Sequence, residues 1–362
     1  MSPDTGQLAL RLAKQIEGSG PISVAEYMRA SNNEYYGAGD PFGVEGDFIT
    51  APEISQMFGE LIGMWLTDLY LRQNSPANCH YVELGPGRGT LAADALRAMS
   101  KFEFAPAVHF VETSETLRAQ QLQNVPLATF HDRVESLPTD GPLLVVANEF
   151  FDALPIRQLI LTHAGWRERV VVRDRGTKFA AMPGSYPMDG SVPAAFQNSP
   201  VGSIFESSPD AATIMYELAN RIATQGGAIL VIDYGYTQPA LGSTLQAVKA
   251  HDYADPFLDP GTCDLTAHVN FLELANLARM RNLQVAGPTT QGVWLSALGI
   301  GQRSLALAEA SPDKREDIFI ARDRLVKNGE MGTLFKVLAA HSPDWPVPEG
   351  FGRGFPFRHL FS

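Results

Sequence analysis

The chain has 362 residues, 45% of them hydrophobic and 19% charged, with a net charge of −12. This length and balance predict a globular protein of two or three modules. The acidic charge argues against a general nucleic-acid binder, because phosphate contacts need a basic surface. No apolar run is long enough to insert into a membrane, and the amino terminus resembles neither a secretory signal nor a mitochondrial import segment.

Only two cysteines occur, Cys79 and Cys263, and neither they nor the eight histidines have the spacing of metal ligands. We therefore predict no metal and expect both thiols to be buried and reduced. These features favour the bacterial cytoplasm, or the mitochondrial matrix only if the source is eukaryotic.

Residues 1–75 are predicted to form a helical cap that includes a cofactor-covering loop. Helical periodicity covers "GQLALRLAKQIEG", "SVAEYMRA" and "ISQMFGELIGMWLTDLYLRQ", and "NNEYYGAGDPFGVEGDFITAPE" reads as the loop. In "TAPE", Thr50 stands at a helix-cap position, with Glu53 three residues later as its reciprocal partner.

Residues 76–342 alternate short β-branched runs with helical ones, which predicts an α/β, doubly wound, Rossmann-like sheet. "HYVELG", "AVHFVET", "LATFHD", "PLLVVANEF" and "GAILVIDYG" are the first five strands. "LQVAGPTTQG" is a sixth strand and "TLFKVLAAH" a last antiparallel edge strand. "LSALGIGQRSLALAEA" and "SPDKREDIFIARDRLVKN" are predicted helices between them, and 343–362 form a tail.

Two insertions are expected in this sheet, at about 153–206 and about 237–268. In the first, two β-rich runs flank "HAGW" and predict a hairpin. The second holds "AHDYADPFLDPGTCDLTAH", which is too irregular for an element and long enough to be functional.

The turn "ELGPGRG" carries Glu83, Gly85, Gly87 and Gly89 between the first strand and its helix. Glycines here let the backbone turn sharply and let a ligand approach it. A carboxylate before a phosphate cradle would repel a pyrophosphate but attract a cation. S-adenosylmethionine fits this preference, because it carries an ammonium and no phosphate.

Two more acids stand at successive strand ends. Glu112 is placed to accept the ribose hydroxyls, and Asp132 to accept from the adenine amine. A dinucleotide motif would need glycine at Thr90, and no nucleoside-triphosphatase loop occurs. The alternative is a tight turn with surface acids. Further predicted cofactor contacts are Pro86, Thr113, Val134 and Asn148.

"GDFITAPEISQMFGE", "VELGPGRGTL", "NEFFDALP" and "DPGTCDLTAHVNF" together resemble the MidA-like methyltransferases, which are associated with assembly of respiratory complex I. The resemblance runs from about residue 46 to the end. It implies a class I methyltransferase fold with seven strands, and protein arginine methylation on a complex I core subunit. It also implies that Thr50, Pro52 and Glu53 cover the cofactor.

Methyl transfer to a guanidinium needs carboxylates that hold it and accept the released proton. Glu149 in "NEFFDALP" stands at the catalytic corner just past the fourth strand, and Asp152 follows three residues later. Glu53 and His251 complete the predicted catalytic set. Asp152 could instead be a turn acid, and His251 and His268 loop residues.

Two functions stay open at this point. One is a protein arginine methyltransferase, and the other is a cofactor-binding assembly factor that escorts a partner subunit without catalysis. A nicotinamide oxidoreductase is a third reading, which tight NADH binding would support. The acceptor protein, the degree of methylation and the oligomeric state cannot be read from the sequence, and a homodimer is a candidate.

Overall fold

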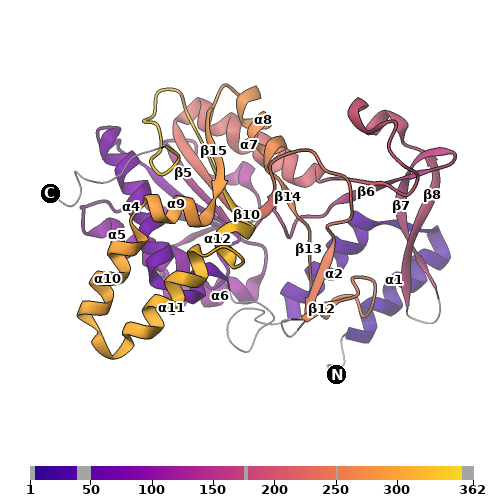
Figure 1. Cartoon of the computed structure of the whole chain (residues 1–362), viewed down its shortest axis with the longest axis horizontal. Helices are drawn as coiled ribbons and strands as arrows, with labels where there is room; N and C mark the ends of the chain where they lie inside the picture. Colours follow the sequence, from indigo (N-terminus) through magenta and orange to yellow (C-terminus); the bar gives the residue numbers. More distant parts are fainter. Residues whose placement is uncertain (1–4, 39–49, 175–177, 250–251, 353–362) are drawn as a thin grey trace. The chain divides into compact units, whose positions relative to one another are not determined.

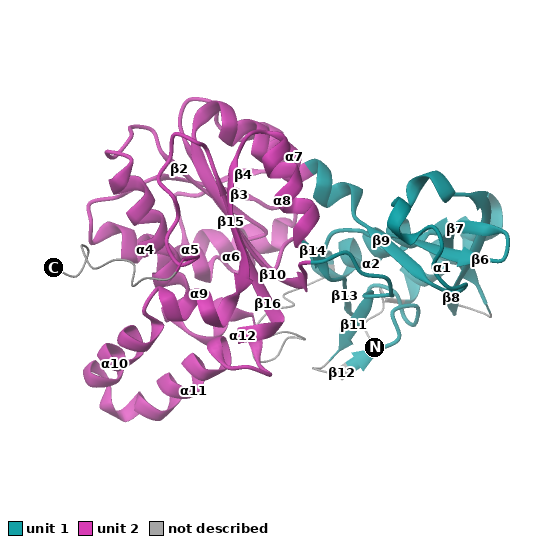
Figure 2. Cartoon of the chain, turned by 45° about the horizontal axis from the view of Figure 1, so that its top comes forward, with its two compact units in different colours: residues 1–48, 152–213, 238–270 teal, residues 49–151, 214–237, 271–362 magenta. Residues whose placement is uncertain are grey.

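The computed structural model describes residues 5–38, 50–174, 178–249 and 252–352. The chain divides into two compact units, and each collects three separate stretches of sequence (Figure 2). The first unit consists of residues 1–48, 152–213 and 238–270. The second unit consists of residues 49–151, 214–237 and 271–362.

The second unit is built on a mixed sheet with the order β15-β16-β10-β5-β2-β3-β4. The strands β5, β10 and β15 of this sheet are labelled in Figure 1. The five strands β10, β5, β2, β3 and β4 run parallel, and β16 lies antiparallel to both β10 and β15. In chain order the strands are β2 His80–Leu84, β3 Ala107–Val111, β4 Thr129–His131, β5 Leu143–Asn148, β10 Gly227–Tyr236, β15 Gln284–Thr290 and β16 Phe335–His341.

Helices cover both faces of this sheet, so its inner strands are buried almost throughout, whereas the edge strands β4 and β15 are partly exposed. Because side chains alternate along a strand, Leu144 and Val146 of β5 join the core beneath α4 and α5, whereas Leu143 and Val145 point to the opposite face. The helices of this unit are α3 Ala51–Ile54, α4 Gln56–Arg72, α5 Thr90–Ser100, α6 Glu115–Asn124, α8 Phe271–Met280, α9 Gln291–Ala297, α10 Ile300–Ala310, α11 Arg315–Val326 and α12 Met331–Leu334. The helix α7 Pro209–Gln225 also belongs to it from residue 214 onward.

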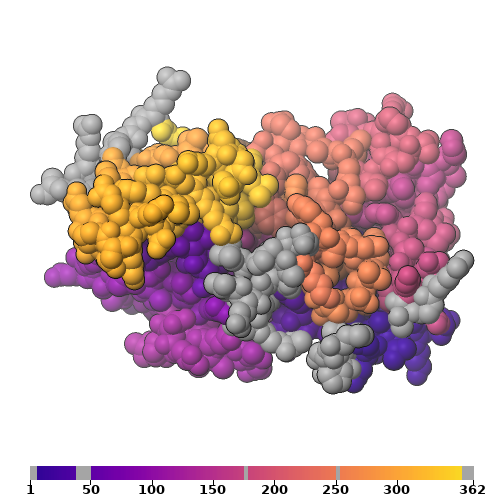
Figure 3. All heavy atoms as spheres, turned by 60° about the horizontal axis from the view of Figure 1, so that its bottom comes forward, coloured from indigo at the N-terminus to yellow at the C-terminus, as the bar shows by residue number. Residues whose placement is uncertain are grey.

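The helices α10 and α11 form a hairpin that is anchored to α4 by an ion pair with the buried carboxylate of Glu60. The guanidinium of Arg303 on α10 donates to the Glu60 carboxylate at 2.7 Å, and Arg97 of α5 donates to the same carboxylate at 3.2 Å. These two contacts outweigh desolvation and lower the pKa of Glu60. In the space-filling view, α9 to α11 form one surface against the purple residues of α4 and α5 (Figure 3).

The first unit packs two helices against antiparallel strands, around a core that includes Leu8, Tyr27, Val171 and Leu265. One sheet has the order β1-β7-β6-β9 with β8 beside β7, and a small sheet has the order β12-β11-β13. The elements are α1 Thr5–Ser19, β1 Ile22–Ser23, α2 Val24–Ala38, β6 Arg157–Thr162, β7 Gly165–Arg173, β8 Phe179–Pro187, β9 Ile204–Ser207, β11 Gln246–Lys249, β12 Asp252–Ala254, β13 Asp264–Thr266 and β14 Val269–Asn270.

The structure confirms the predicted α/β sheet and the hairpin around "HAGW", where β6 and β7 pair antiparallel. Three details of the prediction are wrong. The strand β16 is not at the edge, because β15 pairs on its outer side. The single helix expected across "LSALGIGQRSLALAEA" is broken into α9 and α10 at Gly299, whose φ is +92°. The irregular stretch after β10 contains the short strands β12 and β13.

Candidate cofactor and active site

The glycine turn at the end of β2 has a backbone that residues with side chains rarely adopt. Gly85, Gly87 and Gly89 have φ of +57°, +55° and +80°. A Cβ on Gly85 would approach the Phe150 ring to 3.0 Å, so this ring lies directly against the turn. The turn leads into α5 at Thr90, and it forms a cradle of bare backbone at the carboxyl end of the central strand.

Glu83 lies in β2 just before this turn and is buried, with 3% of its surface exposed. The hydroxyl of Tyr81 donates to its carboxylate at 2.6 Å. Desolvation raises the pKa of Glu83 to about 8, although the tyrosine hydrogen bond opposes the shift. The carboxyl group is therefore mostly protonated at neutral pH, and a cation beside it would favour the ionised form.

Glu112 follows β3 and lies at the same edge of the sheet. Its carboxylate accepts from the amide of Ser114 at 2.7 Å and from Gln121 at 3.3 Å. Desolvation nevertheless raises its pKa. The Gln121 side chain also donates to the Gly87 carbonyl at 2.8 Å, so it ties the glycine turn to the acid of the next strand.

Asp132 follows β4 and is paired with Arg118 of α6. Its side chain is 76% exposed, and Arg118 donates to it at 2.6 Å. Arg118 also donates to the Glu112 carbonyl at 2.9 Å and lies over the Phe130 ring, with its guanidinium carbon 5.4 Å from the centroid. The guanidinium of Arg118 thus holds Asp132 at the end of the third strand. The contact of Asp132 with adenine stays a prediction.

Asn148 and Glu149 end β5 at this edge. Glu149 has a φ of +50°, which is uncommon for a residue with a side chain and marks functional sites more often than chance. Its carboxylate accepts from the Ala51 amide and from the Asn148 side chain, both at 3.3 Å. The Oδ1 atom of Asn148 is buried without a hydrogen-bond partner among the described residues.

The segment before α4 does not form the predicted capping box. Thr50 occupies the cap position of α3, but its side chain makes no capping hydrogen bond. The cap of α4 is Ser55, whose hydroxyl accepts from the Met57 amide at 3.2 Å. The Glu53 carboxylate instead accepts from the Thr90 hydroxyl at 2.6 Å, which joins this segment to the first residue of α5.

The remaining predicted residues have different placements. Pro52 is half-buried in α3, Pro86 lies in the glycine turn, Thr113 is exposed after β3, and Val134 is buried in the 3-10 helix η1, Val134–Ser136. Asp152 is buried in the first unit, where its carbonyl accepts from the Ala267 amide at 2.9 Å. His251 lies outside the described residues.

The structure thus gathers Glu83, the glycine turn, Glu112, Asn148 and Glu149 at one sheet edge in the second unit. Sequence reasoning missed Gln121 and Arg118, which hold these strand ends together. These residues fit a nucleoside with an attached cation, because Glu83 is a buried carboxyl group beside the turn and the buried Oδ1 atom of Asn148 has no protein donor among the described residues. A Cβ at Gly85 would meet the Phe150 ring, so the turn can present only backbone there.

This strand order, with a glycine turn after the central strand and acids at the following strand ends, defines a class I S-adenosylmethionine-dependent methyltransferase. The chain belongs to a family of S-adenosyl-L-methionine-dependent methyltransferases, whose model matches residues 61–289. Within the described residues, no helix is long and apolar enough to cross a membrane.

Named relatives and a solved structure resemble most of the chain. A mitochondrial protein arginine methyltransferase of Drosophila melanogaster, the NDUFAF7 homologue, is 36% identical, with 94% of this chain and 88% of that protein covered. Human NDUFAF7 is 33% identical, with 91% and 82% covered. A Burkholderia thailandensis protein bound to S-adenosyl-homocysteine superposes with a TM-score of 0.86 at 25% identity, with 99% of each chain covered.

Proposed function

We propose that this protein methylates arginine side chains of a partner protein, and that the partner is a subunit of respiratory complex I. The names of its relatives support an arginine acceptor. The geometry that carries the proposal is Glu149, a carboxylate held in a left-handed backbone conformation at the catalytic corner after β5. The compartment is the bacterial cytoplasm, or the mitochondrial matrix if the source is eukaryotic.

Each residue of the edge has a role in this proposal. Glu83 would bind the ammonium of S-adenosylmethionine, Glu112 the ribose hydroxyls, and Asp132 the adenine amine, while the glycine turn would approach the ligand by backbone. The cofactor supplies a methyl group activated by a sulfonium. Glu149 would orient the guanidinium and accept the proton that its nitrogen loses on methylation.

The experiment is a Glu149→Gln substitution assayed with labelled S-adenosylmethionine and lysate from cells that lack the protein. We expect the wild type to label one polypeptide on arginine, and the variant to lose about 100-fold or more in kcat. The dissociation constant for S-adenosyl-homocysteine should change less than about threefold. Glu103→Gln is the matched control, because Glu103 is exposed and has a similar φ of +57°.

Full turnover by Glu149→Gln would refute the proposed role of this carboxylate. A label on a residue other than arginine would refute the acceptor. If the wild type binds S-adenosyl-homocysteine but labels nothing, the reading as a non-catalytic escort replaces the enzyme.

A further inference from the structure

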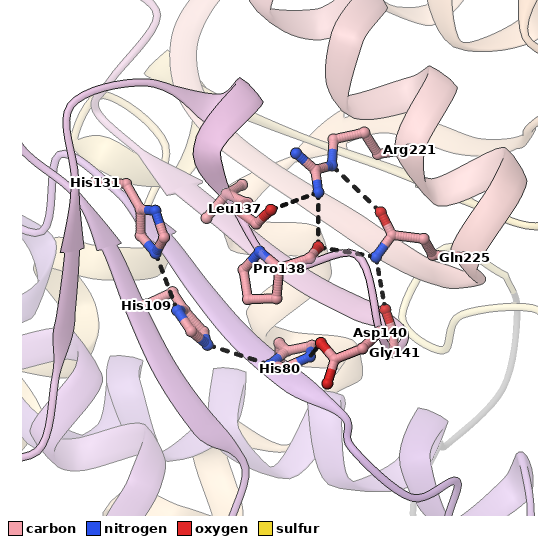
Figure 4. A network of polar contacts seen from close by, with 9 residues as sticks. All are labelled: His80, His109, His131, Leu137, Pro138, Asp140, Gly141, Arg221 and Gln225. Carbon is pink, nitrogen blue, oxygen red and sulfur yellow. Dashed lines mark hydrogen bonds and ion pairs between the residues drawn. The ribbon is translucent and has the colours of Figure 1, made fainter.

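Three histidines on neighbouring strands form a hydrogen-bonded chain across the sheet of the second unit (Figure 4). His80 Nδ1 lies 3.1 Å from His109 Nε2, and His109 Nδ1 lies 3.0 Å from His131 Nε2. Val82 pairs with His109, and Val111 with His131, so all three imidazoles point to one face of the sheet. We call these three residues the histidine chain.

Both ends of the histidine chain contact one short connection, residues 133–141 between β4 and β5. His80 Nε2 lies 3.2 Å from the carboxylate of Asp140, and His131 Nδ1 lies 3.1 Å from the hydroxyl of Ser136. The connection begins directly after Asp132 and contains Val134. On the proposed site, it therefore forms the adenine side of the cofactor pocket.

Two side chains of α7 hold the same connection by donating hydrogen bonds to the backbone carbonyls of residues 134–141. Arg221 is buried, and its guanidinium donates to four carbonyls in the stretch from Val134 to Pro138, at 2.6 to 3.1 Å. Gln225 donates to the carbonyls of Pro138 and Gly141 at 3.0 and 2.8 Å (Figure 4). The connection is thus positioned by side-chain hydrogen bonds along its length.

The histidine chain needs one proton more than neutral imidazoles supply. Ser136 donates its own hydrogen to the Arg133 carbonyl at 2.8 Å, so His131 must donate to Ser136. Asp140 can only accept while ionised, so His80 must donate to Asp140. The two contacts between imidazoles need one proton each. Four N–H donors are therefore required, whereas three neutral imidazoles carry one each.

The surroundings decide which imidazole carries the extra proton. Burial, followed by repulsion from His80 and His131, lowers the pKa of His109 to about 4. Burial also lowers the pKa of His131, and Arg221 and Arg118 add to this shift. His80 faces the carboxylate of Asp140. Further charged or titratable groups near this network include Asp132, Glu135, Glu217 and the thiol of Cys79, whose pKa burial raises to about 12.

We propose that the histidine chain holds four N–H protons, with His80 as an imidazolium paired to Asp140, and that this charged chain positions residues 133–138 for cofactor binding. In this state His109 and His131 are neutral and carry their proton on Nδ1. The part of this proposal that concerns cofactor binding rests on the proposed function, since Asp132 and Val134 are proposed cofactor contacts. His80, His109 and His131 are positioning residues and do not take part in the chemistry.

The proposal fixes the direction of a pH effect. Because the four contacts need four N–H protons, the arrangement stays complete only while the extra proton is bound, and higher pH favours loss of that proton. One of the four contacts must then break, and the contact at Ser136 lies in the connection that holds Val134, a proposed cofactor contact. The contribution of the histidine chain to cofactor affinity should therefore fall as pH rises.

Asp140→Asn is the decisive variant, because an exposed carboxamide can donate to His80 Nε2. Three neutral imidazoles then satisfy every contact, and no extra proton is needed. Ser136→Ala removes the hydrogen-bond acceptor at the other end of the histidine chain. In this variant all three imidazoles should be neutral, and each should carry its proton on Nε2, so that every N–H donates in the direction of Asp140. Asp313→Asn is the matched control, since Asp313 is exposed in the 3-10 helix η4, Pro312–Lys314, in the same unit.

The first measurement is the ¹⁵N spectrum of the imidazoles at about pH 6.5. We expect one imidazolium and two Nδ1–H tautomers in the wild type and in Asp313→Asn. Three neutral rings are expected in Asp140→Asn, and Nε2–H tautomers in Ser136→Ala. Three neutral rings in the wild type would overturn the proposal, whether or not the cofactor binds.

The second measurement is the dissociation constant of S-adenosyl-homocysteine from about pH 5.5 to about pH 9. The ratio of the wild-type constant to that of Asp140→Asn should rise by about threefold to tenfold with pH, because effects shared by both proteins cancel in the ratio. The ratio for Asp313→Asn should stay constant. A constant ratio for Asp140→Asn would overturn the positioning role, whereas absence of wild-type binding would refute the proposed site itself.

Discussion

Glu83 is a buried carboxyl group that is prepared for a cation. Glu83→Gln should stabilise the ligand-free protein, because it removes an ionisation that burial disfavours and keeps an acceptor for Tyr81. At about pH 8 we expect a gain in the free energy of unfolding on the order of 2 kcal/mol. The same change should weaken S-adenosylmethionine binding by about tenfold or more. Thermal unfolding and calorimetric titration measure the two effects.

The pH dependence has a definite sign. The folded-state pKa of Glu83, about 8, lies above the ordinary value of 4.5, so the wild type loses stability relative to the variant between these two pH values. The stability difference should therefore be small near pH 4.5 and largest from pH 8 upward. Binding of the ammonium at neutral pH should also release close to one proton in the wild type. A variant that is equally stable at both ends of this range would contradict the argument.

Glu149 combines a proposed chemical role with a strained backbone. Glu149→Gly should relieve the left-handed conformation and raise the free energy of unfolding by about 1 kcal/mol, while turnover is lost. Glu103→Gly is the matched control, because Glu103 has a φ of +57° in an exposed turn. Urea unfolding should show a similar gain for both, and the methylation assay should separate them. Loss of stability in Glu149→Gly would mean that its side-chain contacts outweigh the strain.

Single residues of the site could be predicted only where chain order determines their position. Glu83 lies near the carboxyl end of β2 and Glu112 follows β3, and the ends of such parallel strands meet at one edge whatever the details of packing. Gln121 and Arg118 lie on α6, where they look like any solvated helical residues until the distance to the edge is known. The histidine chain depends on strand register, because His80 begins β2 whereas His109 and His131 lie further along β3 and β4.

At the scale of elements, α4 and α5 illustrate packing that overrides helix propensity. A Cβ on Gly63 of α4 would lie 2.4 Å from the Ala95 carbonyl oxygen of α5, closer than any real contact. Gly63→Ala should therefore destabilise the protein by about 1–3 kcal/mol, although alanine favours helices. Gly301 of α10 is the control, since a Cβ there meets no atom within 4 Å. Gly301→Ala should stabilise by up to about 1 kcal/mol in the same denaturant titration.

If both glycine variants were stabilised, the close approach of α4 and α5 would be refuted. The sequence predicted both helices from their periodicity but not this contact, because a glycine within a helix can serve packing or merely be tolerated. The break at Gly299 and the place of β16 inside the sheet could not be predicted from local sequence patterns either. Helical periodicity continues across the break, and strand order within a sheet is set by contacts between distant segments.

At the scale of the molecule, the two units are interleaved along the chain. The chain passes from the second unit into the first after β5, for residues 152–213, and again after β10, for residues 238–270. The sequence predicted insertions at these two points, because the alternation of strands and helices is interrupted there. That both insertions pack with residues 1–48 depends on long-range contacts that no local pattern encodes. The predicted module bounds of 1–75, 76–342 and 343–362 stay a prediction.

Every proposed cofactor contact lies in the second unit, so ligand binding should stabilise that unit selectively. At about 100 times its dissociation constant, S-adenosyl-homocysteine adds about 2.7 kcal/mol against openings that break its contacts. Hydrogen exchange should therefore slow in peptides covering residues 82–90 and 143–149. The β6–β7 hairpin of the first unit should exchange as before. NADH is the control ligand, because its diphosphate would meet Glu83 beside the glycine turn, and it should slow neither region. Protection of residues 82–90 by NADH instead would favour a nicotinamide enzyme, and equal slowing in the hairpin would place the ligand elsewhere.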